Sequence, residues 1–198
     1  MQKSQPEPQV PDSVLIAEAA KGSKAAFNTV MIQQAPRLHN MALRLMGDKS
    51  DAEDAVQEAL AAAWFKLASF DQSRPINPWL TRVTVNKCRD ILRKRRIRRF
   101  FEFDGSDDIE LTIADTAPDP IADLHARQAL EIMQREITRL PAKLREPFVL
   151  VTFGDNSQAQ AAHILGISEK AVETRIYRAR TKLREIYKTL RGEGSLVV

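Results

Sequence analysis

The 198-residue sequence is poor in cysteine and glycine, and it has no long apolar run. Its one cysteine, Cys88, excludes an internal disulfide, and no cluster of cysteine and histidine has the spacing of a zinc site. No apolar stretch approaches the roughly 20 residues that cross a bilayer, and the polar, proline-rich start lacks a signal-peptide core. We therefore expect a cytoplasmic protein with no membrane insertion, metal or cofactor.

The composition also lacks the features of a β protein. There are seven glycines and few alternating β-branched runs, whereas alanine, leucine and the long polar residues favour helices. Hydrophobic residues make up 43% of the chain, which is enough to form packed cores. The length fits one domain or two small ones, at roughly 100–200 residues per domain. We expect an all-α fold.

Charge is distributed unevenly along the chain, although the net charge is only +4. Residues 87–99 carry eight lysines and arginines, whereas residues 100–126 carry none and hold eight acidic residues together with Gly105, Pro118 and Pro120. Such a segment is typical of a flexible acidic linker. The sequence thus predicts a disordered tail at 1–12, a helical domain at 13–102, a linker at 103–122 and a second helical domain at 123–198.

A helix-turn-helix is predicted within the second domain, between residues 157 and 184. Ser157 and Gln160 form a capping-box pattern, Gly166 allows a tight turn with positive φ, and Ser168 offers a second N-cap. One stripe of the second helix is apolar, and its other faces are mostly basic or polar. The stripe consists of Val172, Ile176, Ala179 and Leu183. Such a helix suits the major groove of DNA, although a solvated helix of an ordinary bundle would share the pattern.

The helix expected at 51–68 has an acidic face in an otherwise basic protein. Asp54, Gln57 and Glu58 are spaced to share one side of it. Such a face can simply be solvated, because acidic residues suit a helix N-terminus. Paired carboxylates can also serve acid–base catalysis or bind metal, but no nucleophile, glycine-rich phosphate loop or histidine site accompanies them. We therefore expect no enzyme activity, and the residues alone leave the role of this face open.

The helix expected at 78–99 becomes strongly basic in its second half. A cationic run of this density favours contacts with phosphate, although it could also be a solubilising helix end. Phe70 and Trp79 flank the loop before this helix, where an aromatic ring beside a cationic groove could stack on single-stranded bases. Both rings could equally belong to the core, and we expect this of Trp79.

Several short motifs follow one another along the chain. In the first half they are Ala52-Glu53-Asp54-Ala55-Val56-Gln57-Glu58, Trp64, Phe70-Asp71, Pro78-Trp79-Leu80, Asn86 and Asp90. In the second half they are Leu140-Pro141, Arg145-Glu146, Leu165-Gly166-Ile167-Ser168, Ala171-Val172-Glu173-Thr174-Arg175 and Arg178-Ala179-Arg180. Each motif is modest alone. In this order, across an acidic linker, they resemble an extracytoplasmic-function (group IV, sigma-70 family) sigma factor of RNA polymerase, over about residues 13–190.

The resemblance implies a transcription initiation factor that directs core RNA polymerase to −35 and −10 promoter elements and melts the −10 region. The first domain would dock on a coiled coil of the largest polymerase subunit, and the flap of the polymerase would be a further contact. The positions that match docking residues are Asp54, Gln57 and Glu58. Unpaired −10 bases would be captured by Phe70 and Asn86. The cations that would hold phosphate are Lys87, Arg93, Lys94 and Arg95.

The same resemblance places the second helix of the helix-turn-helix in the −35 element. The matching contact positions are Ser168, Lys170, Glu173, Thr174, Arg175, Tyr177 and Arg178. Glu173 departs from the family pattern, because many relatives carry a cation there. A carboxylate can accept a hydrogen bond from cytosine or pair along its own helix with Lys170 or Tyr177, and we favour base reading.

Two further expectations follow from the resemblance: the acidic linker would pass through the RNA exit path, and an anti-sigma factor would be a partner. Two other classes of protein compete with this interpretation. A transcription regulator with a sensing or dimerising first domain would explain only the second half of the chain. A scaffold or anti-factor adaptor would leave the recognition helix without a role. Co-elution with core polymerase and a defined transcript would separate the three.

Overall fold

The computed structural model describes residues 12–101 and 122–193, and every regular element in these ranges is helical. The first group of helices is α1 (Asp12–Ala20), α2 (Lys24–Met46), α3 (Lys49–Lys66), the 3-10 turn η1 (Leu67–Ser69) and α4 (Ile76–Phe101). The second group is α5 (Ala122–Arg139), α6 (Ala142–Thr152), α7 (Gln158–Leu165) and α8 (Glu169–Glu193). The all-α prediction is confirmed. The predicted tail and linker lie outside the described residues except at their last positions, Asp12 and Ala122.

Side-chain and glycine caps set the helix boundaries in the first group. The Ser23 hydroxyl accepts from the Ala26 amide at 3.3 Å, and α2 ends at Gly47, where φ is 76°. The cap of α3 is Asp48, whose carboxylate accepts from the Asp51 amide at 2.8 Å. The sequence had indicated Ser50 or Asp51 for this role. Both lie inside the helix instead, because Asp48 is the residue with extended backbone, at φ −125° and ψ 131°.

The first core forms where α2, α3 and α4 pack together. α3 contributes mainly small buried residues, which let its neighbours approach closely: Ala52, Ala55, Ala59 and Ala63. Leu38 and Met41 of α2 and Leu80 of α4 fill the space between the helices, and all three are fully buried. α4 begins at Ile76, two residues before the predicted start, and Pro78 is accommodated in its first turn.

The second core lies beneath the helix-turn-helix. The predicted stripe of α8 is buried at all four positions, Val172, Ile176, Ala179 and Leu183. It packs on α6 and α7, where Val149, Leu150 and Ala161 are fully buried. Pro147 lies in the middle of α6. The helix continues through it, since one proline removes a single intrahelical hydrogen bond.

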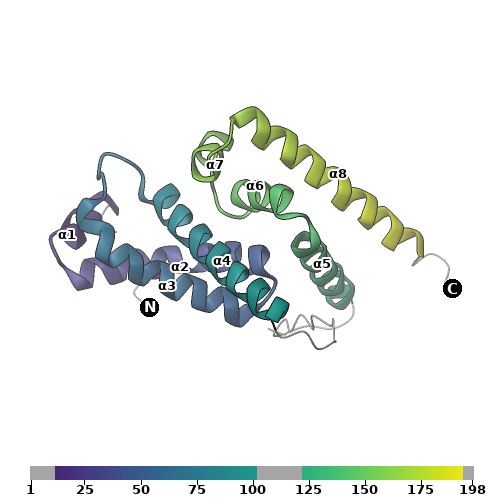
Figure 1. The fold of residues 1–198 in the computed structure, drawn as a ribbon, viewed down its shortest axis with the longest axis horizontal. Helices are drawn as coiled ribbons and strands as arrows, with labels where there is room; N and C mark the ends of the chain where they lie inside the picture. Colours follow the sequence, from purple (N-terminus) through teal and green to yellow (C-terminus); the bar gives the residue numbers. More distant parts are fainter. Residues whose placement is uncertain (1–11, 102–121, 194–198) are drawn as a thin grey trace, which may run out of the picture.

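The two groups of helices contact each other, with α6 beside α2 and α7 beside α4 (Figure 1). The Arg37 guanidinium of α2 donates to the Gly154 carbonyl at 2.8 Å and to the Thr81 hydroxyl at 2.9 Å. Arg89 of α4 makes a two-pronged ion pair with Glu146 of α6, at 2.9 and 2.7 Å. We call this set of contacts the domain seam; it also includes Arg44 on the Phe153 ring and Arg82 on the His163 carbonyl.

Candidate nucleic-acid interface

The helix-turn-helix is held in shape by local hydrogen bonds that follow directly from its sequence. The Ser157 hydroxyl accepts from the Gln160 amide at 3.1 Å, and the Gln160 side chain accepts from the Ser157 amide at 2.8 Å. Gly166 closes α7 in the left-handed region, with φ at 69°. The Ser168 hydroxyl then caps α8 by accepting from the Ala171 amide at 3.2 Å. The predicted capping box, turn glycine and second cap are confirmed.

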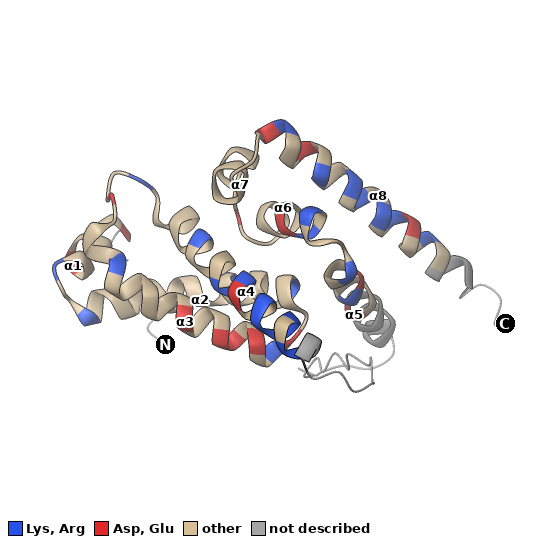
Figure 2. Cartoon of the chain, viewed as in Figure 1, with Lys and Arg blue, Asp and Glu red and all other residues tan. Residues whose placement is uncertain are grey.

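The outer face of α8 is exposed and predominantly basic. Figure 2 shows lysines and arginines repeating along the coloured part of α8. The helix continues to Glu193, beyond the predicted end at Arg184. Tyr177 is 70% exposed on this face. Among the seven positions expected to contact DNA, Arg175 is half-buried. The other six are exposed: Ser168, Lys170, Glu173, Thr174, Tyr177 and Arg178. The geometry fits insertion of α8 into a major groove.

Glu173 is paired along its own helix in the structure. The Lys170 ammonium lies 2.8 Å from the Glu173 carboxylate, and both side chains are largely exposed. The intrahelical pair, which is the alternative to base reading, is therefore present in this structure. An exposed pair of this spacing is worth only about 0.3–0.5 kcal/mol, so a base can compete for either group. Base reading by Glu173 stays a prediction.

The basic positions of α4 divide between two directions. Lys87 and Arg95 turn toward α3, where they pair with Glu58 at 3.0 Å and with Asp51 at 2.8 Å. Arg93 pairs with Asp90 on its own helix. Asn86 and Lys94 are exposed. The structure thus brings one predicted phosphate ligand, Lys87, against one predicted docking residue, Glu58.

The acidic face of α3 is exposed as the spacing predicted. Asp54, Gln57 and Glu58 all reach solvent, and Figure 2 shows the acidic positions following one another along α3. Ala52, Ala55, Val56 and Ala59 hold the opposite side of the helix in the core. The carboxylates are therefore held at the surface, where they can meet a protein surface of opposite charge, Glu58 after giving up its pair with Lys87.

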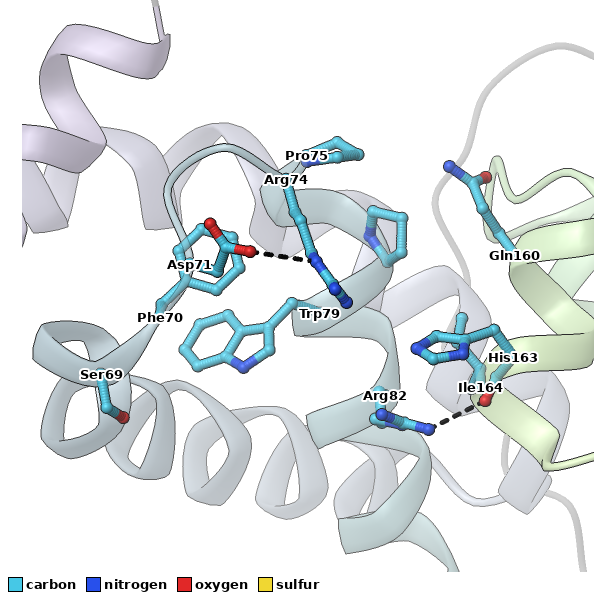
Figure 3. Close-up of a pocket in the computed structure, with 11 residues that line it drawn as sticks. Ser69, Phe70, Asp71, Arg74, Pro75, Trp79, Arg82, Gln160, His163 and Ile164 are labelled. Atoms are coloured by element: carbon cyan, nitrogen blue, oxygen red, sulfur yellow. Dashed lines mark hydrogen bonds and ion pairs between the residues drawn. The ribbon is translucent and has the colours of Figure 1, made fainter.

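Phe70 and Trp79 form one wall of a pocket of about 340 Å³ (Figure 3). Their ring centroids are 4.9 Å apart, and both rings are half-buried, so Trp79 is less enclosed than expected. The loop that follows Phe70 is ordered by Asp71, which accepts from the Ser73 hydroxyl and pairs with Arg74 at 3.1 Å. Hydrogen bonds from Ser73 lower the pKa of Asp71 and favour its charged form. The opposite wall comes from α7 across the domain seam, through Gln160, His163 and Ile164.

The residues of the domain seam were missed by sequence reasoning. Arg37 donates to groups on α2, α4 and the α6–α7 loop, and burial lowers the pKa of its guanidinium. Burial likewise lowers the pKa of Arg44, which stacks on Phe153 with 4.1 Å between its guanidinium carbon and the ring centroid. The contacts of Arg37 with Gly154 and of Arg44 with Phe153 join positions more than 100 residues apart, and no local pattern signals them.

Residues 12–101 and 122–193 contain no group of three or more histidine, cysteine, aspartate or glutamate side chains that could hold a metal ion. No helix in the same ranges is both long and apolar enough to cross a membrane.

Comparison with known proteins decides the family. The sigma-70 region 2 family model matches residues 31–98, and the sigma-70 region 4 family model matches residues 130–183. The RNA polymerase sigma factor CnrH of Cupriavidus metallidurans is 38% identical over 179 residues, which are 89% of this chain and 94% of CnrH. This chain belongs to the sigma-70 family. Within it, the chain belongs to the extracytoplasmic-function (ECF) sigma factors.

Other similar proteins agree with this ECF sigma factor assignment. SigW of Bacillus subtilis, an ECF sigma factor, is 29% identical over 86% of this chain and 93% of SigW. The solved structure of CnrH with the cytosolic domain of CnrY has a TM-score of 0.67 and 31% identity, and covers 90% of this chain and 97% of CnrH. The structure of the sigma factor RpoE of Bartonella quintana with the anti-sigma factor NepR has a TM-score of 0.70 and 27% identity. It covers 82% of this chain and 96% of the RpoE chain. The resemblance stated from the motifs is confirmed.

Proposed function

We propose that this ECF sigma factor binds core RNA polymerase and directs it to promoters with −35 and −10 elements, where it melts the −10 region. The observation that carries the proposal is that one chain exposes three matched surfaces. These are an acidic face on α3, the basic helix α4 with its aromatic pocket, and the capped helix-turn-helix of α7 and α8. The two matched family regions contain all three surfaces.

The acidic face of α3 is our candidate for polymerase docking. Asp54, Gln57 and Glu58 are exposed on a helix whose other side is fixed in the core, so they present a rigid pattern of charge. A coiled coil of the largest subunit is the proposed partner, and complementary charge would set the orientation of docking. The flap of the polymerase is the proposed partner of the second group of helices.

The start of α4 and the preceding loop are our candidates for the −10 element. Phe70, beside Trp79, offers an aromatic surface on which an unpaired base can stack, and Asn86 offers an amide that can read a base edge. Phosphate contacts are assigned to the exposed or half-buried cations further along α4, which are Lys87, Arg93, Lys94 and Arg95.

The exposed face of α8 is our candidate for the −35 element. Its polar side chains project from a helix that α6 and α7 hold from behind. The proposed contacts are Ser168, Lys170, Glu173, Thr174, Arg175, Tyr177 and Arg178. In this proposal, residues 13–102 and 123–198 act as separate domains joined by 103–122 when both elements are bound.

An anti-sigma factor is the proposed regulator, and the cytoplasm is the proposed compartment. The support is that both sigma factor structures compared above were solved with a second protein. CnrH was solved with the cytosolic domain of CnrY, and RpoE was solved with the anti-sigma factor NepR. The contacts of the domain seam hold the two groups of helices side by side, so one anti-sigma factor could bind both groups at once.

Reconstituted transcription tests the proposed function. The purified chain is mixed with core polymerase from the same cells and with a library of promoter fragments, and transcripts are sequenced from their 5′ ends. We expect co-elution with core polymerase and transcripts that start downstream of one shared pair of elements. A chain that binds duplex DNA alone and does not co-elute with polymerase would be a regulator of another kind, and the proposal would be wrong.

A further inference from the structure

Phe65 is the most exposed large hydrophobic residue among those the structure describes, at 83%. It lies in the last turn of α3, next to Trp64, whose half-buried ring packs on Phe27 with 4.9 Å between centroids. The core beside α3 is thus filled by Trp64 and by small buried residues, and Phe65 takes no part in it. Single exposed apolar residues are common on protein surfaces, so exposure alone assigns Phe65 no role.

The position of Phe65 along α3 supplies the second observation. Phe65 follows Glu58 by seven residues and Asp54 by eleven, which correspond to about two and three turns of helix. Asp54, Glu58, Ala61 and Phe65 therefore share one side of α3, and all four are exposed. We call these four residues the α3 row. It places an aromatic ring about 10 Å along the helix axis from the second of two carboxylates, across one small residue.

Charge decides which kind of partner the α3 row can take. Its carboxylates repel nucleic-acid phosphate, so the row is unsuited to promoter DNA. A basic protein surface is complementary to it, because arginine can pair with a carboxylate and can also stack on an aromatic ring. In protein interfaces, a buried aromatic side chain near the centre commonly carries a large share of the binding energy.

We infer that Phe65 is an apolar anchor in the surface through which α3 docks on a basic helical surface of core polymerase. The inference rests on the proposed function, because it extends the docking set of Asp54, Gln57 and Glu58 by about two helical turns. The carboxylates set the orientation of the partner, and the ring of Phe65 loses its exposed apolar area when the partner covers it.

A Phe65→Ala variant of the full chain tests this inference. We expect its affinity for core polymerase, measured by titration of a fluorescently labelled chain, to fall by about five- to thirty-fold. Thermal stability and far-UV circular dichroism should stay unchanged, since the side chain is outside the core. Phe65→Trp should largely retain binding. Ile32→Ala is the matched control: it removes a side chain that is 73% exposed on another helix, and it should leave affinity unchanged.

Two outcomes would overturn the inference, and a third bears on the proposed function instead. Native polymerase affinity in Phe65→Ala would show that Phe65 is only a solvated residue. Self-association of the free chain in sedimentation velocity, lost in Phe65→Ala while polymerase affinity is kept, would show that the α3 row joins two copies of this chain. If the unmodified chain itself fails to bind polymerase, the proposed function is wrong, and the same titration distinguishes that case.

Discussion

At the scale of the residue, Glu173 can make two different contacts on the recognition face of α8. In the structure its carboxylate pairs with Lys170 at 2.8 Å, and in the groove of DNA it could accept a hydrogen bond from a cytosine amino group. The exposed ion pair contributes less free energy than a good base contact. A cytosine in the groove would therefore displace Lys170 from Glu173.

We predict that Glu173→Ala and Glu173→Arg relax or change base preference at one position of the −35 element, by about 1–3 kcal/mol for the preferred base. The measurement is binding of the polymerase complex to a library of −35 sequences. Lys182→Ala removes an exposed charge of α8 outside the proposed contacts and serves as the control. A uniform shift across all sequences would mean that Glu173 only adjusts the charge of α8.

Asn86 and Arg93 lie on the same helix and are expected to differ in what they recognise. Asn86→Ala should impair open-complex formation, followed by permanganate reactivity of unpaired thymines, without a change in polymerase affinity. Arg93→Ala should weaken all promoters about equally and lower the slope of log affinity against log salt by about 0.9, the value for one phosphate contact to duplex DNA. Because Asn86 is exposed, its loss should not unfold the first group of helices; unfolding would assign it a structural role.

At the scale of the element, α3 presents its acidic face as a rigid unit. We predict that reversing the charge of Asp54 and Glu58 to lysine weakens binding to core polymerase by several-fold or more, because like charges then meet across the interface. Far-UV circular dichroism should stay native, since both side chains are exposed. Lys87→Gln is the control, because it breaks the Glu58–Lys87 pair without touching the acidic face. An equal loss of polymerase binding in Lys87→Gln would show that binding depends on the Glu58–Lys87 pair and not on the negative charge of the acidic face.

Helices and their ends were largely predictable from sequence, and the contacts between helices were not. Ser157, Gln160 and Gly166 act within a few residues of one another, so their hydrogen bonds follow from local spacing. Asp48 was missed as a cap because three neighbouring polar residues could fill that position, and the backbone angle selects among them. The pairing of Lys87 with Glu58 depends on the register between two packed helices, which periodicity does not specify.

At the scale of the whole molecule, the domain seam holds the proposed −10 and −35 surfaces in one compact body. Promoter elements at −35 and −10 are about 25 base pairs apart, which is about 85 Å of duplex at about 3.4 Å per pair. A compact chain of this length has a radius of gyration of roughly 16 Å. The two groups of helices therefore have to separate before one chain can meet both elements.

We predict that Glu146→Gln favours this separation, because it removes the charge that Arg89 grips at 2.7 and 2.9 Å. Cys88 is the natural reporter: it is buried near Glu146 and Arg145, and burial raises the pKa of its thiol to about 12. At neutral pH it should react very slowly with a thiol reagent in the unmodified chain. The variant should react about five-fold faster or more, in line with a pair worth about 1 kcal/mol.

Glu136→Gln is the matched control for this prediction, because Glu136 pairs with Arg139 inside α5 and lies outside the seam contacts. Small-angle scattering should show a larger radius of gyration for Glu146→Gln and no change for Glu136→Gln. If neither the radius nor the thiol reactivity changes in Glu146→Gln, the Arg89–Glu146 pair does not hold the two groups of helices together.

The Lys87–Glu58 pair joins a proposed promoter contact to a proposed polymerase contact, so neither partner meets a vacant group. Each must displace a competitor that is tethered a few ångströms away and thus present at high effective concentration. A polymerase that captures Glu58 releases Lys87 for phosphate, and DNA that captures Lys87 releases Glu58. Linkage makes the two effects equal, at about 0.2–1 kcal/mol, the usual worth of an exposed pair. If both proposed contacts form, polymerase and promoter promote each other's binding by exchanging one ion pair, without any movement of a helix.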